Sequence, residues 1–214
     1  MDDLERLQRR IRVARGLEPG DLLLRGGRIV NVFTGQIEPG NVVIADGWIA
    51  GVGPYDWQAR DVIDLDGRPL VPGLIDAHMH LESTLLWPPE LARALVPHGT
   101  AAIIADPHEI ANVLGIPGVE MMLAASEDLP LDIFFMAPSC VPATSWEDAG
   151  AVLDAAAVER LLRLPRVLGL AEVMDFPAVL DGRAPVLAKI LAARRRGAPI
   201  DGHAPGLRGQ SLGS

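Results

Sequence analysis

The sequence is poor in several features, and each scarcity excludes a class of protein. Its 214 residues include one cysteine, Cys140, so no disulfide can form within the chain, which fits a reducing compartment. The net charge of −9 argues against a broad basic surface for nucleic acid. No apolar run approaches the roughly 18 residues of a membrane span. The stretch MDDLERLQRR is too charged for a secretory signal. We therefore expect a cytoplasmic protein that binds neither nucleic acid nor membranes.

The composition is that of a globular chain, since 49% of the residues are hydrophobic and 22% are charged. Residues 1–20 are predicted to contain a helix that Asp2 or Asp3 caps and Gly16 follows. Between residues 21 and 70, DLLLR-GG-RIVNVF and NVVIA-DG-WIAGV predict strand pairs around two-residue turns, because Gly-Gly and Asp-Gly accept positive φ. DVIDLDG adds another strand. We predict a small β-sandwich module over residues 21–70.

After Val71, apolar segments alternate with helical patterns. Strands are predicted over 74–78, 101–105, 132–137, 167–172 and 198–203, and the segments between them include PPELARALV, PGVEMMLAA, AAAVERLLRL and APVLAKILAARRR. This alternation favours βαβ units and a parallel sheet. Continuous apolar strands are typical of strands buried on both faces. Residues 71–214 are therefore predicted to form the first five strands of a partial (β/α)8 TIM-like barrel, an α/β fold.

Polar residues follow each predicted strand, which is where barrels of this type carry their active sites. His78 and His80, at i and i+2, share one face of a strand and can grip one metal ion. The other polar residues at this rim include Glu82, Asp106, His108, Glu172, Asp201 and His203. Such a mixed nitrogen and oxygen set suits Zn, Mn or Fe(II) better than Ca or Mg. Alternatively, Asp106 caps the next helix and His203 serves as a turn residue.

Three other residues invite a functional interpretation that the sequence does not favour. HEIAN, which begins at His108, lacks the second histidine of the H-E-x-x-H motif. His98 precedes a strand, so we place it at the opposite rim with a structural role. Cys140 is expected to be a packed thiol rather than a nucleophile, since no histidine lies near it in sequence.

The ordered segments resemble the amidohydrolase superfamily and, within it, the adenine deaminases. They are GLIDAHMHLES, ADPHEIANVLG, APSCVPAT, GLAEVMDFP and DGHAPGL, and the resemblance covers roughly residues 21–207. The H-x-H is shared by the superfamily, whereas HLES, DPHEIANV and the glutamate of GLAEVMDFP are more specific to adenine deaminases. Thr84 stands where a serine is commoner.

This resemblance implies that adenine and water give hypoxanthine and ammonia at a binuclear divalent site, with Mn²⁺ or Fe²⁺ favoured and Zn²⁺ as an alternative. His78 and His80 would bind one ion, Glu172 would bridge, and His203 would bind the second. Glu82, Asp106 and His108 are candidate catalytic residues. The only lysine, Lys189, lies in a helical stretch, which disfavours relatives that bridge their metals with a carboxylated lysine.

The resemblance also implies a histidine after a sixth strand and a general-base aspartate after an eighth. Neither occurs in this sequence, so we expect a truncated chain that shows no turnover by itself, and a possible homo-oligomer for the full-length protein. Two other hypotheses remain. One is a different hydrolase of the superfamily, acting on a nucleobase or a cyclic amide. The other is a non-catalytic fragment.

Overall fold

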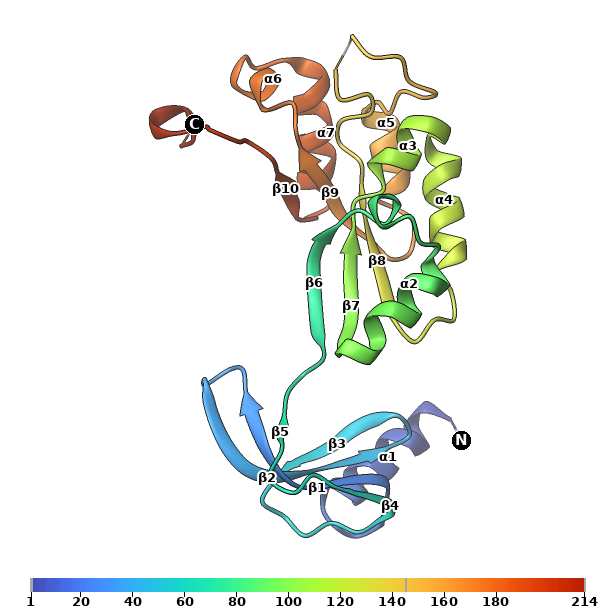
Figure 1. The fold of residues 1–214 in the computed structure, drawn as a ribbon, viewed down its shortest axis with the longest axis vertical. Helices are drawn as coiled ribbons and strands as arrows, with labels where there is room; N and C mark the ends of the chain where they lie inside the picture. The colour runs from blue at the N-terminus through green and yellow to red at the C-terminus, as the bar shows by residue number, and fades with distance from the viewer. Residues whose placement is uncertain (1, 145, 214) are drawn as a thin grey trace. The chain divides into compact units, whose positions relative to one another are not determined.

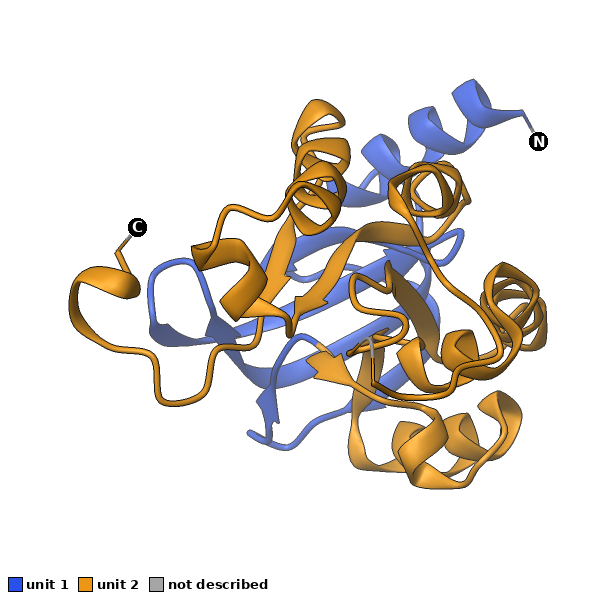
Figure 2. Cartoon of the chain, turned by 90° about the horizontal axis from the view of Figure 1, so that it is seen from above, with its two compact units in different colours: residues 1–72 blue, residues 73–214 orange. Residues whose placement is uncertain are grey.

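The computed structural model describes residues 2–144 and 146–213. The chain divides into two compact units, residues 1–72 and residues 73–214 (Figure 2). Within the described ranges, no helix has both the length and the apolar character required to cross a membrane.

Unit 1 combines one helix with one sheet. Helix α1 (Asp3–Ala14) begins where predicted, because the Asp2 side chain accepts the Glu5 amide and the Glu5 side chain accepts the Asp2 amide. The sheet has the order β3-β2-β1-β4, with β5 also paired to β1. Its strands are β1 (Gly20–Asn31), β2 (Gln36–Ala45), β3 (Trp48–Gly53), β4 (Ala59–Asp64) and β5 (Pro69–Leu70).

The two predicted hairpin turns have different outcomes. The Asp46-Gly47 turn joins β2 to β3 as predicted, with φ of 53° and 76°. The predicted turn at Gly26-Gly27 is wrong, because β1 continues through both glycines and only shifts its register against β2. Gly26, at φ 69°, accommodates an extra residue within the strand rather than a reversal. A β-sandwich is not confirmed, since the described residues of unit 1 form a single sheet.

Unit 2 is built on a parallel sheet of order β10-β9-β8-β7-β6. The predicted strands are confirmed, although the last is shorter than expected. They are β6 (Leu74–Met79), β7 (Thr100–Ala105), β8 (Asp132–Ala137), β9 (Val167–Val173) and β10 (Ile200–Gly202). The curled sheet matches the predicted barrel type, and helices lie around its outside (Figure 2).

The four predicted helices of unit 2 are also confirmed. They are α2 (Pro88–Leu95), α4 (Ile116–Ala125), α5 (Ala155–Leu161) and α7 (Ala184–Arg195). Two short helices were not predicted, α3 (His108–Leu114) and α6 (Phe176–Leu180), and three single turns accompany them, η1 (Glu82–Thr84), η2 (Val96–His98) and η3 (Gly209–Ser211). Short elements of this kind offer too few turns for a clear apolar periodicity.

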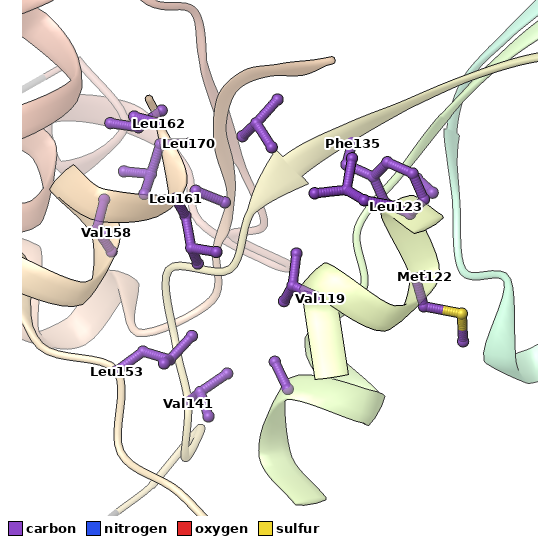
Figure 3. Close-up of a cluster of buried hydrophobic side chains, with 14 of the residues drawn as sticks. Val119, Met122, Leu123, Phe135, Val141, Leu153, Val158, Leu161, Leu162 and Leu170 are labelled. Carbon is purple, nitrogen blue, oxygen red and sulfur yellow. The ribbon is translucent and has the colours of Figure 1, made fainter. Parts of the chain in front are cut away.

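The core of unit 2 lies between the sheet and its helices (Figures 1 and 3). Phe135 and Leu170 project from neighbouring strands and pack with Val119 of α4 and Val158 of α5, all fully buried. Each such side chain contributes about 1.5–3 kcal/mol on burial. The expectation of strands buried on both faces is wrong for β6, where Leu74 and Ile75 are 59% and 66% exposed. Strand β6 has only one neighbouring strand among the described residues.

Candidate metal centre

The predicted site residues meet at one edge of the unit 2 sheet. His78 and His80 come from the end of β6, and Glu172 comes from the end of β9. Asp106 directly follows β7, and His203 directly follows β10. The strands are parallel, so their carboxyl ends lie together, as the sequence argument required.

The Glu172 carboxylate is the centre of this arrangement. It is only 5% exposed. Its Oε1 lies 3.3 Å from Nε2 of His80 and 3.7 Å from Nε2 of His78, and its Oε2 lies 2.6 Å from Nδ1 of His203. One buried carboxylate thus faces three imidazoles, a set of donors able to share a bound cation.

Two of these imidazoles are oriented by a contact to their other ring nitrogen. Nδ1 of His80 lies 3.0 Å from the Asp106 carbonyl oxygen, and Nδ1 of His78 lies 3.0 Å from Oδ2 of Asp201. Donation from Nδ1 leaves the Nε2 lone pair free for a metal ion, as in carboxylate–histidine–metal sites. The sequence placed Asp201 at this rim, beside His203, but gave no sign of its role in orienting His78.

Asp106 is the most deeply buried charged residue of the site, at 2% exposure. Neither of its carboxylate oxygens has a hydrogen-bond partner among the described residues. The alternative that it caps the next helix is wrong, since the N-cap of α3 is Pro107 and no side-chain cap bond forms there. An unpaired buried carboxylate is costly, and a bound cation would remove that cost.

His108, the first residue of α3, faces Asp106. Its Nδ1 lies 3.3 Å from Oδ2 of Asp106 without the alignment of a hydrogen bond in these side-chain positions. The nearby Asp106 carboxylate raises the pKa of His108, against the opposing effect of burial. Sequence reasoning placed His108 at the rim but did not predict the helix that presents it.

Among the described residues, one group offers donor atoms that all lie within 4.8 Å of one another. It consists of His80, Asp106, His108 and Glu172. Two imidazole nitrogens and two carboxylate oxygens suit a divalent ion such as Zn, Mn or Fe, and the unpaired Asp106 oxygens support that fit. His78 and His203 contact Glu172 but lie outside this group.

Glu82 lies beside this group, in the turn η1. Its Oε1 accepts the Ile110 amide at 2.9 Å, and its Oε2 has no hydrogen-bond partner in the described part of the chain. Burial raises the pKa of the Glu82 carboxyl, which favours its protonated form over the carboxylate. Glu82 is therefore a polar group with spare hydrogen-bonding capacity near the centre.

The remaining residues lie where the sequence argument put them. His98 ends η2, before the start of β7 and thus at the opposite end of that strand from Asp106. Cys140 is buried at 6% exposure. Lys189 lies within α7, and its ammonium donates to the Ser139 carbonyl at 2.7 Å while burial lowers its pKa. The only lysine is therefore outside the donor group.

A parallel sheet with histidines and carboxylates at its carboxyl edge is the arrangement of a metal-dependent hydrolase. The family model described as "Amidohydrolase family" matches residues 70–211. The chain belongs to the amidohydrolase family.

Its curated relatives include adenine deaminases from several bacteria. The chain is 47% identical to the enzyme of Listeria welshimeri over 99% of its length, and 53% identical to that of Dehalococcoides mccartyi over 96%. It is 48% identical to adenine deaminase 2 of Desulfotalea psychrophila over 97% of its length. The chain spans 36% of the length of each of these proteins.

Solved structures agree with the fold. The L-hydantoinase of Arthrobacter aurescens matches 86% of this chain with a TM-score of 0.64 and 15% identity, over 41% of its own chain. A D-hydantoinase also matches 86% of this chain, with a TM-score of 0.61 and 20% identity, over 40% of its own chain. At these identities the likeness concerns the fold alone.

Proposed function

We propose that this chain is part of an adenine deaminase, which converts adenine and water to hypoxanthine and ammonia in purine salvage and adenine catabolism. The observation that supports adenine as the substrate is the identity of 47–53% to proteins of that name over 96–99% of the chain. The metal-type donor group, centred on Glu172, supports hydrolysis as the reaction class.

The ligand assignment that we propose follows the contacts of Glu172. His78 and His80 would hold one divalent ion, His203 would hold a second, and Glu172 would be a ligand shared by both. Its carboxylate lies within 3.7 Å of all three imidazoles, which supports this assignment. Mn²⁺ or Fe²⁺ is favoured over Zn²⁺. Such ions, when bound, supply Lewis-acid activation of water near neutral pH.

The proposed roles of the other polar residues concern protons. Water adds to C6 of adenine, the bond from C6 to the amino nitrogen breaks, and the nitrogen leaves as ammonia after gaining a proton. We assign proton transfer to His108, whose Nδ1 lies 3.3 Å from the Asp106 carboxylate that raises its pKa. We assign a polar contact with the purine to Glu82, whose Oε2 has no hydrogen-bond partner among the described residues.

We further propose a three-part organisation and a cellular setting for the protein. Residues 1–20 form an N-terminal helix, residues 21–70 a β module, and residues 71–214 a portion of the catalytic barrel. Five parallel strands of a curled sheet support the barrel assignment. The full-length protein acts in the cytoplasm as a homo-oligomer.

The test is an assay of the protein made from its complete reading frame and loaded separately with Mn²⁺, Fe²⁺ or Zn²⁺. We expect stoichiometric hypoxanthine and ammonia from adenine, and no product from guanine, cytosine or dihydroorotate. The Glu172→Gln variant is the matched negative control. Failure to form hypoxanthine with all three metals would refute the proposal, and turnover of a different substrate in the panel would redirect it.

A further inference from the structure

A pocket of about 300 Å³ opens next to the metal centre. His108 belongs to both, since its ring lines the pocket and one of its nitrogens belongs to the donor group. Asn112 of α3 and Cys140, which follows β8, contribute to the wall, as does Met174, which follows β9. The volume is at the lower end of the range for small-molecule sites, about 300–1,000 Å³.

Asn112 has an unsatisfied side chain at this pocket. Its Oδ1 is buried and has no hydrogen-bond partner among the described residues. Its backbone carbonyl, by contrast, accepts the Gly150 amide at 2.8 Å. The helix and the loop are therefore joined through the backbone, and the side-chain amide remains available. A buried acceptor without a partner is costly, so an N–H donor from a ligand is the natural complement.

The rest of the wall combines three apolar side chains, Cys140, Ala143 and Met174, with the carboxylates of Glu109 and Glu147. The apolar side chains suit the face of a flat ring, and the carboxylates can accept further N–H groups at its edge. Thioether sulfur contacts aromatic edges favourably, and apolar side chains of this kind stack against nucleobases. Asparagine is also the side chain that pairs with adenine through one acceptor and one donor on the same amide. Ring stacking and amide pairing together describe a purine.

We propose that Asn112 is a specificity-determining residue that accepts an N–H of a purine held in this pocket. The inference rests on the proposed function and deepens it, by assigning recognition of the base to a residue outside the metal donor group. Asp106 cannot replace it in this role, because it does not line the pocket.

The experiment compares the metal-loaded protein with its Asn112→Ala variant. Affinity is measured by titration calorimetry for adenine and for its N9-methyl and N6,N6-dimethyl analogues, together with turnover and bound metal. We expect adenine to bind the variant about 10- to 100-fold more weakly, with unchanged metal content. We also expect one methylated analogue, lacking the contacted N–H, to bind both proteins equally. Gln8→Ala removes an exposed amide of α1 and is the matched control.

The outcomes separate the pocket from the reaction. Equal adenine affinity in both proteins, with normal turnover, overturns the role of Asn112 and leaves the proposed function standing. A loss confined to ligands that carry the N–H, in a protein that does not deaminate adenine, supports the pocket and overturns the proposed function. An unmodified protein that neither binds nor deaminates adenine overturns both. Equal losses for every analogue indicate a structural role and also overturn the inference.

Discussion

Each unit of the molecule gathers polar side chains around one charged group, and the two clusters differ in how completely their hydrogen bonds are satisfied. In unit 1, the Arg9 guanidinium bonds Glu18, Asp21 and Asp46 at 2.7–3.1 Å. In unit 2, the Glu172 carboxylate faces three imidazoles, and neither oxygen of the neighbouring Asp106 carboxylate has a hydrogen-bond partner within the described ranges.

The difference separates a stabilising cluster from a binding one. Arg9 joins α1 to the sheet, so its ion pairs connect elements that are distant in sequence. Asp106 has one close charged or polar neighbour, Nδ1 of His108 at 3.3 Å, but neither of its carboxylate oxygens makes a hydrogen bond among the described residues, so its burial at 2% exposure is costly unless a cation binds. A buried carboxylate without a hydrogen bond is therefore the sharper functional signal of the two.

The largest effect is expected from Glu172→Gln, which keeps the shape of the side chain but removes its charge. Because this carboxylate faces three imidazoles, we expect metal affinity to fall by more than about 100-fold. That loss is larger than the one usual for residues that only orient a metal ligand. Titration calorimetry with Mn²⁺ measures it. An unchanged affinity for Mn²⁺ would mean that the metal binds elsewhere, and the Glu172 cluster would then no longer differ from the Arg9 cluster as a binding site.

Asp106→Asn should have opposite effects with and without metal. Metal affinity should fall about 10- to 100-fold. In the metal-free protein, removing a buried charge whose oxygens make no hydrogen bond among the described residues should instead raise the free energy of unfolding by about 1–3 kcal/mol. Thermal unfolding in EDTA tests the predicted gain in stability, and thermal unfolding in Mn²⁺ tests the predicted loss of stabilisation by metal. A metal-free variant less stable than the parent would mean that Asp106 stabilises the fold, as Arg9 does.

Arg9→Ala should destabilise unit 1 by about 1–3 kcal/mol. The substitution removes a guanidinium that is only 16% exposed and leaves the three surrounding carboxylates without their ion pair. Hydrogen exchange of the β2 and β3 amides locates the loss, and metal affinity should not change. Arg6→Ala, an exposed arginine of the same helix, is the control. If the two substitutions lowered stability equally, the Arg9 ion pairs would contribute no more than an exposed surface charge does.

The smallest effect concerns acid. Hydrogen bonds from Arg9 lower the pKa of Asp21 below its ordinary value of 3.8. A carboxyl with a lower pKa in the folded state contributes stability above the unfolded value and loses it as pH falls through the folded one. Unit 1 should therefore lose protection below about pH 4, and Arg9→Ala should show a smaller loss. Amide exchange of both proteins across pH 3–6 measures this loss. Identical pH profiles of the parent and Arg9→Ala would mean that Arg9 does not affect the titration of Asp21.

Much of the fold could be predicted because local pattern and tertiary environment agree. Apolar runs such as 132–137 became central strands, and Asp46-Gly47 formed its hairpin turn. Gly26-Gly27 has the same local signal but lies within a strand, because pairing of β1 with β2 continues past it. Glycine permits a reversal, and strand pairing decides whether one occurs.

The sequence by itself determined which residues reach the site. Parallel strands place their carboxyl ends together. The βα alternation therefore predicts one shared edge for the polar residues at the strand ends, which are His78, His80, Asp106, Glu172 and His203. Only the tertiary structure decided their relations. Three findings depend on side chains from different strands and helices. The side-chain oxygens of Asp106 and Asn112 are buried without hydrogen bonds among the described residues, and Asp201 orients His78. Burial and hydrogen bonding are properties of neighbours, and neighbours far apart in sequence are set by packing.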